Sequence, residues 1–138
     1  MSFLLDTNVL SELRKGRRCD RSVRQWARPA EPELHTSVVV IGELKRGVER
    51  VRPKDPRFAA ELERWLTRLI ATMGPRILPV DRVIALEWGR LSAPRTVPPI
   101  DGLLAATALV RGMTLVTRNV KDFVDLGVSY LNPFDARH

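Results

Sequence analysis

Short apolar runs alternate along this chain with segments in which apolar residues recur every three or four positions. The runs predict five strands, at residues 3–5, 34–37, 77–80, 113–117 and 128–131. The repeating segments between them have the spacing of amphipathic helices. Strands that alternate with helices typically form a parallel sheet with helices on both faces. We therefore predict an α/β fold of three layers, α/β/α, with a parallel sheet of about five strands.

Two of the expected helices have well-defined apolar stripes. The first covers residues 38–51, and its expected core stripe is Ile41, Leu44, Val48 and Val51. The second covers residues 58–73 and is the clearest amphipathic helix of the chain. We assign this second helix to packing or to dimerisation rather than to catalysis.

Prolines and acids mark where other elements begin and end. Asp20 is expected to cap a short helix that ends before Pro29, and Asp81 is expected to act only as a helix cap. Pro79 favours an edge position for the third strand, since proline cannot donate a backbone hydrogen bond. The alanine- and leucine-rich helix that begins near Asp101 is apolar nearly all round, so we expect it to be buried in the centre of the fold.

The composition is that of a globular protein. The chain has 138 residues, of which 44% are hydrophobic and 28% charged, and we expect residues 1–138 to form one domain. No apolar run approaches the roughly 20 residues of a membrane span, and Asp6 interrupts the apolar start, which argues against a signal peptide. The single Cys19 excludes an intrachain disulfide and favours the cytoplasm. Neighbouring arginines could lower its pKa, but without a partner base it is expected to be incidental.

The charge balance indicates an anionic partner. The formal net charge is +7, and nucleic acid is the first class of polyanion that such an excess of arginine suggests. Six cations come from segments next to the predicted strand ends. We expect them to form a basic rim that contacts RNA phosphates: Arg14, Lys15, Arg17, Arg18, Lys45 and Arg46.

Four acids follow a strand or begin a helix at the same predicted edge of the sheet. They are Asp6, Glu43, Asp101 and Asp122. Alone, each could be an ordinary helix cap or surface acid. Together they would repel one another unless a cation lies among them. Mg²⁺ and Mn²⁺ prefer oxygen ligands and can activate water for phosphodiester hydrolysis, so the four acids predict a divalent metal site.

The motifs around these acids resemble those of PIN-domain ribonucleases, and specifically VapC-type toxins of bacterial toxin–antitoxin pairs. The motifs lie at residues 5–10, 41–47, 101–108 and 117–123, in the order of the family, and span nearly the whole chain. The resemblance implies a PIN-like fold and a Mg²⁺- or Mn²⁺-dependent endoribonuclease that cuts single-stranded or loop RNA. It also implies a cognate VapB-like antitoxin, with an apolar helix and an arginine that enters the cleft, in a toxin–antitoxin hetero-oligomer. A homodimer is expected as well.

The resemblance also assigns roles to individual residues. Asp6 and Asp101 would be metal ligands, and Glu43 would be a ligand or would orient the attacking water. Asp122 would complete the acidic set. Thr7 and Thr117 would hydrogen-bond the ligands or metal-bound waters.

Three other functions were weighed against the nuclease. A phosphoacceptor receiver domain needs paired acids after the first strand and a lysine after a late strand, where this chain has Thr7-Asn8 and Arg118-Asn119. A haloacid-dehalogenase-type phosphatase needs an aspartate at the position of Asn8. The remaining alternative is a non-catalytic nucleic-acid-binding or regulatory module whose acids are structural caps.

Overall fold

The computed structural model describes residues 1–136. Its sheet has five parallel strands in the order β3-β2-β1-β4-β5. The strands are β1 Phe3–Leu5, β2 Leu34–Ser37, β3 Ile77–Leu78, β4 Thr114–Val116 and β5 Tyr130–Leu131. The helices are α1 Thr7–Leu13, α2 Arg21–Ala30, α3 Val38–Val51, α4 Pro56–Met73, α5 Arg82–Ser92 and α6 Pro99–Arg111. Short 3₁₀ turns are η1 Gly16–Arg18, η2 Glu31–Glu33, η3 Gly74–Arg76, η4 Val120–Asp122 and η5 Val124–Leu126.

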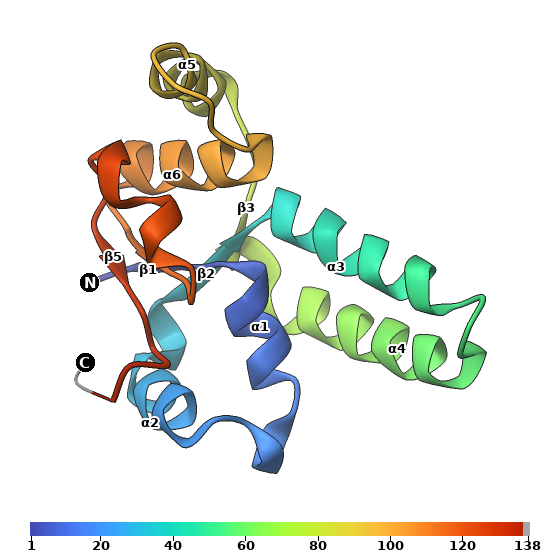
Figure 1. Ribbon diagram of the computed structural model, residues 1–138. Coiled ribbons are helices and arrows are strands. Elements are labelled where there is room, and N and C mark those ends of the chain that lie inside the picture. Colours follow the sequence, from blue (N-terminus) through green and yellow to red (C-terminus); the bar gives the residue numbers. More distant parts are fainter. Residues whose placement is uncertain (137–138) are drawn as a thin grey trace.

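The helices form layers on the two faces of the sheet (Figure 1). Helix α6 covers one face with α5 outside it, and α1 and α2 lie on the other face. Helices α3 and α4 pack side by side and project from the sheet as an arm. The predicted three-layer α/β fold with a parallel sheet of five strands is therefore confirmed.

Strand β1 is the centre of the sheet, and its three apolar residues are buried on both faces. It pairs with β2 on one side and with β4 on the other, so the strand order reverses direction beside it. In open parallel sheets such a switch point, at the carboxyl ends of the strands, is where ligands bind. Asp6 lies there directly after β1, and its backbone N–H donates to the Val116 carbonyl at 2.9 Å.

Helix α6 is the buried helix that its composition predicts. Pro99 opens it, and Gly112 ends it in the left-handed conformation at φ 65°. Its buried residues are Gly102, Leu104, Ala105, Ala106, Thr107 and Ala108. Small side chains allow the helix to lie close to the sheet, and this fixes where Asp101, in its first turn, emerges.

Strand lengths and one helix end differ from the expectations. Helix α2 runs to Ala30, so the prediction that it ends before Pro29 was wrong. A proline in the last turn removes only its own N–H from the helix, and η2 continues the winding directly afterwards. Strand β3 stops at Leu78 because Pro79 lacks the donor for a further ladder bond, and β3 is an edge strand as predicted.

Two expectations about side-chain environments were also incorrect in part. The buried residues of α3 are Val40, Leu44 and Val48, whereas Ile41 and Val51 are only partly buried. The stripe is rotated because α3 packs against both the sheet and α4. Cys19 is buried, and burial raises the pKa of its thiol, contrary to the lowering that the nearby arginines suggested.

The cap expected at Asp81 is confirmed. The Asp81 carboxylate accepts from the Ile84 backbone N–H at 2.9 Å and caps α5, as predicted. Among residues 1–136, no helix combines the length and apolar composition needed to cross a membrane.

Candidate active site at the carboxyl edge of the sheet

Asp6 is a buried carboxylate, and its two shortest hydrogen bonds come from two different segments of the chain. Its residue is 7% exposed, Oδ1 accepts from the Thr7 backbone N–H at 2.7 Å, and Oδ2 accepts from the Thr117 hydroxyl at 2.8 Å. The first contact makes Asp6 the N-cap of α1, and the second joins it to the end of β4. Asp6 is thus both the cap of α1 and a residue of the candidate site, and its side chain has a fixed orientation.

Asn8 supports this arrangement and was not among the residues predicted for the site. Its side-chain amide donates to Asp6 Oδ2 at 3.4 Å and to Thr117 Oγ1 at 3.3 Å. Its amide oxygen accepts from the Arg118 backbone N–H at 3.0 Å. Asn8 therefore ties the start of α1 to the loop after β4. Its position two residues after Asp6, on the same turn, was the available signal.

Glu43 reaches the site from the second turn of α3. It is partly buried, and its Oε1 accepts from the Thr7 hydroxyl at 2.5 Å. The other oxygen, Oε2, lies 3.7 Å from the Arg46 guanidinium. Thr7 therefore fixes the Glu43 carboxylate from α1, so that residues 36 positions apart share one side of the site.

Asp101 is positioned by the close packing of its neighbour Gly102. A Cβ atom at Gly102 would lie 2.8 Å from Cδ1 and 3.0 Å from Nε1 of Trp88, so only glycine fits without a shift. In the described part of the chain, Trp88 Nε1 is the one buried side-chain nitrogen or oxygen without a hydrogen-bond partner. The indole of α5 thus rests directly on the first turn of α6, next to the partly buried Asp101.

Asp122 lies on η4 after β4 and is exposed. It is close enough to act electrostatically on both Asp6 and Asp101. The structure therefore brings all four predicted acids into one electrostatic environment, with Asp6 the most buried and Asp122 the most open.

The four carboxylates repel one another. Burial is the main cause that raises the pKa of Asp6, and the charges of Glu43 and Asp122 raise it further, although hydrogen bonds from Thr117 and Thr7 oppose this. Burial, followed by the charges of Asp6, Asp122 and Glu43, raises the pKa of Asp101 to about 6. Within residues 1–136, no Lys or Arg forms an ion pair with Asp6, Asp101 or Asp122.

These carboxylates repel one another less when a hard divalent cation lies among them. The donors are carboxylate oxygens, which Mg²⁺ and Mn²⁺ prefer. In the region that the structure describes, no three acidic, histidine or cysteine side chains are close enough to hold a metal by themselves. A cation with one or two carboxylate ligands and several waters, as Mg²⁺ commonly has, suits this spacing.

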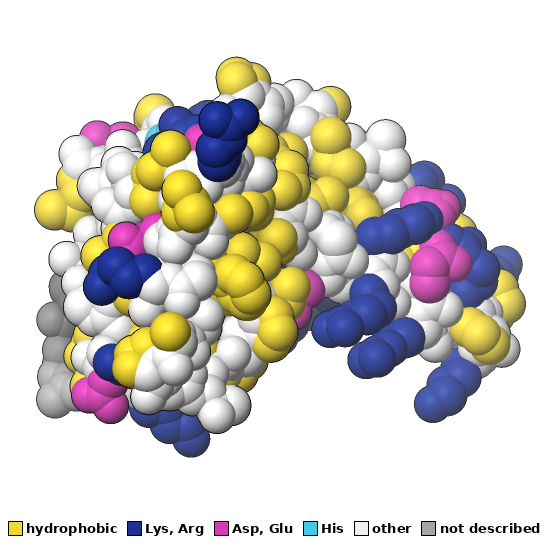
Figure 2. Space-filling model, turned by 90° about the horizontal axis from the view of Figure 1, so that it is seen from above, with side chains coloured by type: hydrophobic (Ala, Val, Ile, Leu, Met, Phe, Trp, Pro, Cys, Tyr) yellow, Lys and Arg dark blue, Asp and Glu magenta, His cyan; other side chains and the backbone are white. Residues whose placement is uncertain are grey.

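The six cations predicted for the RNA rim fall into two environments. Lys45 contacts Glu49 at 2.8 Å and Glu63 at 3.3 Å, and Arg46 lies near Glu43. Lys15 pairs with Glu12 at 3.0 Å. The remaining three, Arg14, Arg17 and Arg18, have no ion-pair partner among the described residues. Figure 2 shows Lys and Arg side chains concentrated on the projecting α3–α4 arm, with acids among them.

The sequence model of the PIN domain family matches residues 3–128 of the chain. The chain belongs to the PIN-domain family. Its relatives include VapC ribonuclease Y4jK of Sinorhizobium fredii, 30% identical over 96% of this chain and 98% of the relative. Toxin FitB of Neisseria gonorrhoeae is 26% identical over 96% of this chain and 98% of that protein. A solved structure of FitAB bound to an IR36 DNA fragment matches this PIN domain with a TM-score of 0.85, at 26% identity over 99% of this chain and 98% of that one.

Proposed function

We propose that this PIN-domain protein is a metal-dependent endoribonuclease that serves as the toxin of a toxin–antitoxin pair, with residues 1–138 forming one nuclease domain. The observation that carries the proposal is the acidic edge itself. Carboxylates from separate segments of the chain share one electrostatic environment there, and within residues 1–136 no Lys or Arg forms an ion pair with Asp6 or Asp101. The relatives named VapC ribonuclease and Toxin FitB support the same activity and role.

In this proposal the residues of the chain have distinct tasks. Asp6 and Asp101 hold Mg²⁺ or Mn²⁺, and Asp122 completes the acidic set. Thr117 and Asn8 hold Asp6 in one orientation through hydrogen bonds of 2.8 and 3.4 Å. Thr7 fixes one carboxylate oxygen of Glu43. Glu43 orients the attacking water or is itself a metal ligand. When bound, the metal supplies an activated water and stabilises the charge that develops on the scissile phosphate.

A cleavage assay with two matched variants tests the nuclease. Asp101→Asn removes a ligand charge at nearly constant size and should lower kcat/KM on single-stranded RNA by about 100-fold or more. Asp81→Asn is the control, because it makes the same change at the cap of the neighbouring helix and asparagine caps well. Circular dichroism should show both variants folded. Cleavage by a folded Asp101→Asn protein within a few-fold of wild type would contradict the assignment.

The requirement for a divalent ion is tested in the same assay. Activity should depend on Mg²⁺ or Mn²⁺ and should vanish in excess chelator. A protein that binds RNA but does not cut it under any metal condition would instead be the non-catalytic nucleic-acid-binding module.

The toxin role implies partners in the cell. We expect the protein to act in the cytoplasm and to be inhibited by an antitoxin that covers apolar surface on α3 or α4 and inserts an arginine among the carboxylates. Arginine matches carboxylates with two parallel hydrogen bonds. A homodimer is expected through the remaining exposed apolar surface, to which Ile70 of α4 contributes.

Expression in cells tests this role. The wild-type chain expressed alone should arrest growth, Asp6→Asn should relieve the arrest, and co-expression of the adjacent small reading frame should restore growth. Its product should co-purify with the protein. If abundant soluble wild-type protein has no effect on growth, the toxin role fails while the nuclease activity can still stand.

A further inference from the structure

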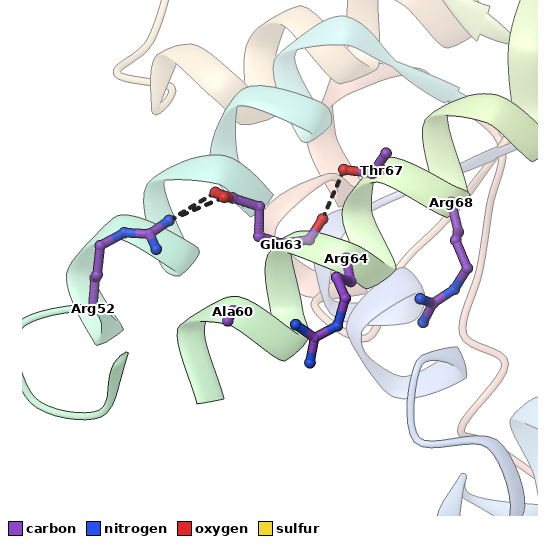
Figure 3. A pocket seen from close by; sticks show the side chains of 6 residues that line it. All are labelled: Arg52, Ala60, Glu63, Arg64, Thr67 and Arg68. Atoms are coloured by element: carbon purple, nitrogen blue, oxygen red, sulfur yellow. Dashed lines mark hydrogen bonds and ion pairs between the residues drawn. The ribbon is translucent and has the colours of Figure 1, made fainter. Parts of the chain in front are cut away.

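Cations without carboxylate partners surround one side of helix α4. A hollow beside this helix is lined by Arg14, Glu61, Arg64, Trp65 and Arg68. Arg64 and Arg68 are exposed and one helical turn apart. Figure 3 shows both extending from the same side of α4, while Glu63 points toward Arg52. Among the described residues, neither Arg64 nor Arg68 forms an ion pair.

A second hollow continues from the first across Arg14. It is lined by Arg14, Lys15, Arg18 and Phe58. The Arg14 guanidinium lies over the Phe58 ring, 5.6 Å from its centroid, so it spans from α1 to the start of α4. We call the two hollows together the α1–α4 cleft. Its mouth carries five cations and one acid, Glu61.

The cleft is continuous with the acidic site. A third hollow shares Arg14, Phe58 and Trp65 with the α1–α4 cleft and ends at Thr7 and Glu43. Thr7 is the first residue of α1 and Arg14 caps its carboxyl end, so the two lie about 10 Å apart along one helix at 1.5 Å per residue. This third hollow joins the carboxylates to the unpaired arginines, and apolar side chains, among them Leu44, Val48 and Leu62, line it in between.

The pairing of cations elsewhere makes this cleft distinctive. In an adjoining hollow, which Arg64 and Arg68 also line, Arg52 pairs with Glu49 and Glu63, and Lys45 pairs with the same two acids (Figure 3). Those charges are neutralised within the protein. The unpaired arginines come from the end of α1 and from α4, and they line one cleft. They are suited to a ligand that carries its negative charges along a chain.

We propose that the α1–α4 cleft binds the single-stranded RNA that flanks the cleavage point. Its phosphates contact Arg14, Arg64 and Arg68, and its bases stack on Trp65 and Phe58. Aromatic side chains between cations are the pattern that binds single strands without strict sequence preference. The proposal rests on the proposed nuclease function. It adds Arg64 and Arg68 to the rim expected from the sequence and leaves out Lys45 and Arg46, whose charges are paired.

Binding of a fluorescein-labelled single-stranded RNA of about 16 nucleotides, followed by fluorescence anisotropy in excess chelator, tests the cleft. The test variant is Arg64→Ala/Arg68→Ala, which changes only exposed side chains. The matched control is Arg21→Ala/Arg28→Ala, which removes two exposed arginines from α2, a helix that does not line the cleft. Titrations at several salt concentrations between about 50 and 200 mM give the salt dependence of binding.

The test variant should bind about 10-fold more weakly, and the slope of log affinity against log salt should become shallower by about 1.4, the value for two lost phosphate contacts on a single strand. The control should stay within about twofold, with an unchanged slope. In the cleavage assay with metal, the test variant should raise KM and leave kcat unchanged, because the arginines bind substrate away from the reacting atoms.

Three results would overturn the proposal. The first is a test variant that binds RNA like the control while wild type still cleaves RNA, which leaves the nuclease function intact. The second is unchanged RNA binding together with loss of the co-purifying antitoxin, which makes the cleft a protein-binding site. The third is a wild-type protein that neither binds nor cleaves RNA, in which case the proposed function fails with it.

Discussion

The carboxylates of the α3–α4 arm and those of the sheet edge are the same chemical groups in opposite environments. Hydrogen bonds from Arg52 and Lys45 lower the pKa of Glu49 to about 2, and the same two cations lower the pKa of Glu63. At the sheet edge, burial and neighbouring acids raise the pKa of Asp101 to about 6. Glu49 and Glu63 of the arm are paired with cations, whereas no Lys or Arg among residues 1–136 forms an ion pair with Asp6, Asp101 or Asp122 at the edge.

This difference separates charges that are paired within the structure from charges that the proposed function assigns to a metal ion. The network on the arm is exposed, so solvent screens it and its contribution to stability is small. The edge destabilises the protein slightly when nothing neutralises it, because like charges are held together. Substitutions at the edge should therefore lower activity and raise stability in chelator, whereas substitutions on the arm should leave activity unchanged and lower stability slightly.

The largest expected effect of these substitutions is on catalysis. Asp6→Asn should reduce kcat/KM on RNA by about 100-fold or more, because it removes a ligand charge from the most buried carboxylate. Glu49→Gln makes the equivalent change on the arm and should leave kcat/KM within about twofold. Similar losses in the two variants would remove the distinction between the regions.

The next effect is the response to metal. Excess Mg²⁺ or Mn²⁺ should raise the Tm of wild type by about 3–6 °C, since binding to the native state neutralises the repulsion. The same ions should not shift the Tm of Asp101→Asn. Differential scanning fluorimetry with and without chelator measures both. An equal shift in Asp101→Asn would mean that the ions bind elsewhere.

The dependence of stability on pH should have opposite signs in the two regions. Since the pKa of Asp101 is raised to about 6, the native state binds more protons than the unfolded state between its ordinary pKa of 3.8 and that value. The free energy of unfolding therefore falls as pH rises through this window. In chelator, Asp101→Asn should have the same Tm as wild type at pH values below this window. Above the window its Tm should be higher by about 3 °C. The difference is modest because the Asp101 side chain is only partly buried.

Glu49 gives the reverse case. Its pKa is lowered to about 2, so its pairs stabilise the native state fully above its ordinary pKa of 4.5, and this contribution is lost as pH falls. Thermal melts of Asp101→Asn and Glu49→Gln across pH 4–7 compare the two. Parallel pH profiles for the two variants would refute the assignment of opposite environments.

The smallest effect is expected from the network on the arm. Glu63→Gln removes the acid that joins Arg52 and Lys45 across α3 and α4, and should lower the Tm by about 1–2 °C at low salt. The difference from wild type should shrink at high salt, because exposed ion pairs are screened. A loss that does not change with salt would indicate a packing contribution instead.

The sequence predicted the layers and the strand count because apolar spacing determines them locally, although β3, β4 and β5 are shorter than the expected residues 77–80, 113–117 and 128–131. Residues 3–5 are apolar without interruption, and they form the central strand. The bounds of α3 match the expected residues 38–51. The end of α2 and the exact stripe of α3 depend on packing against later parts of the chain, which no local pattern contains.

The four acids could be selected from the sequence because they follow strand ends, but their supporting contacts could not. Asn8 bridges Asp6 and the loop after β4 over 110 positions, through an interaction that needs the folded sheet. The division of the basic rim into paired and unpaired cations also depends on α3 lying against α4. The sequence predicts only packing or dimerisation for the helix that carries Arg64 and Arg68, since spacing alone does not show which arginine on its other faces has a partner.

The contact between Gly102 and Trp88 gives the protein a built-in optical probe. The indole of Trp88 lies against the residue next to Asp101, with its N–H buried and unbonded, so its emission is sensitive to small displacements of the first turn of α6. The two other tryptophans lie elsewhere, Trp26 against Phe3 and Trp65 in the α1–α4 cleft. A chain in which phenylalanine replaces those two would report occupancy of the acidic edge through the fluorescence of one native side chain, without any attached dye.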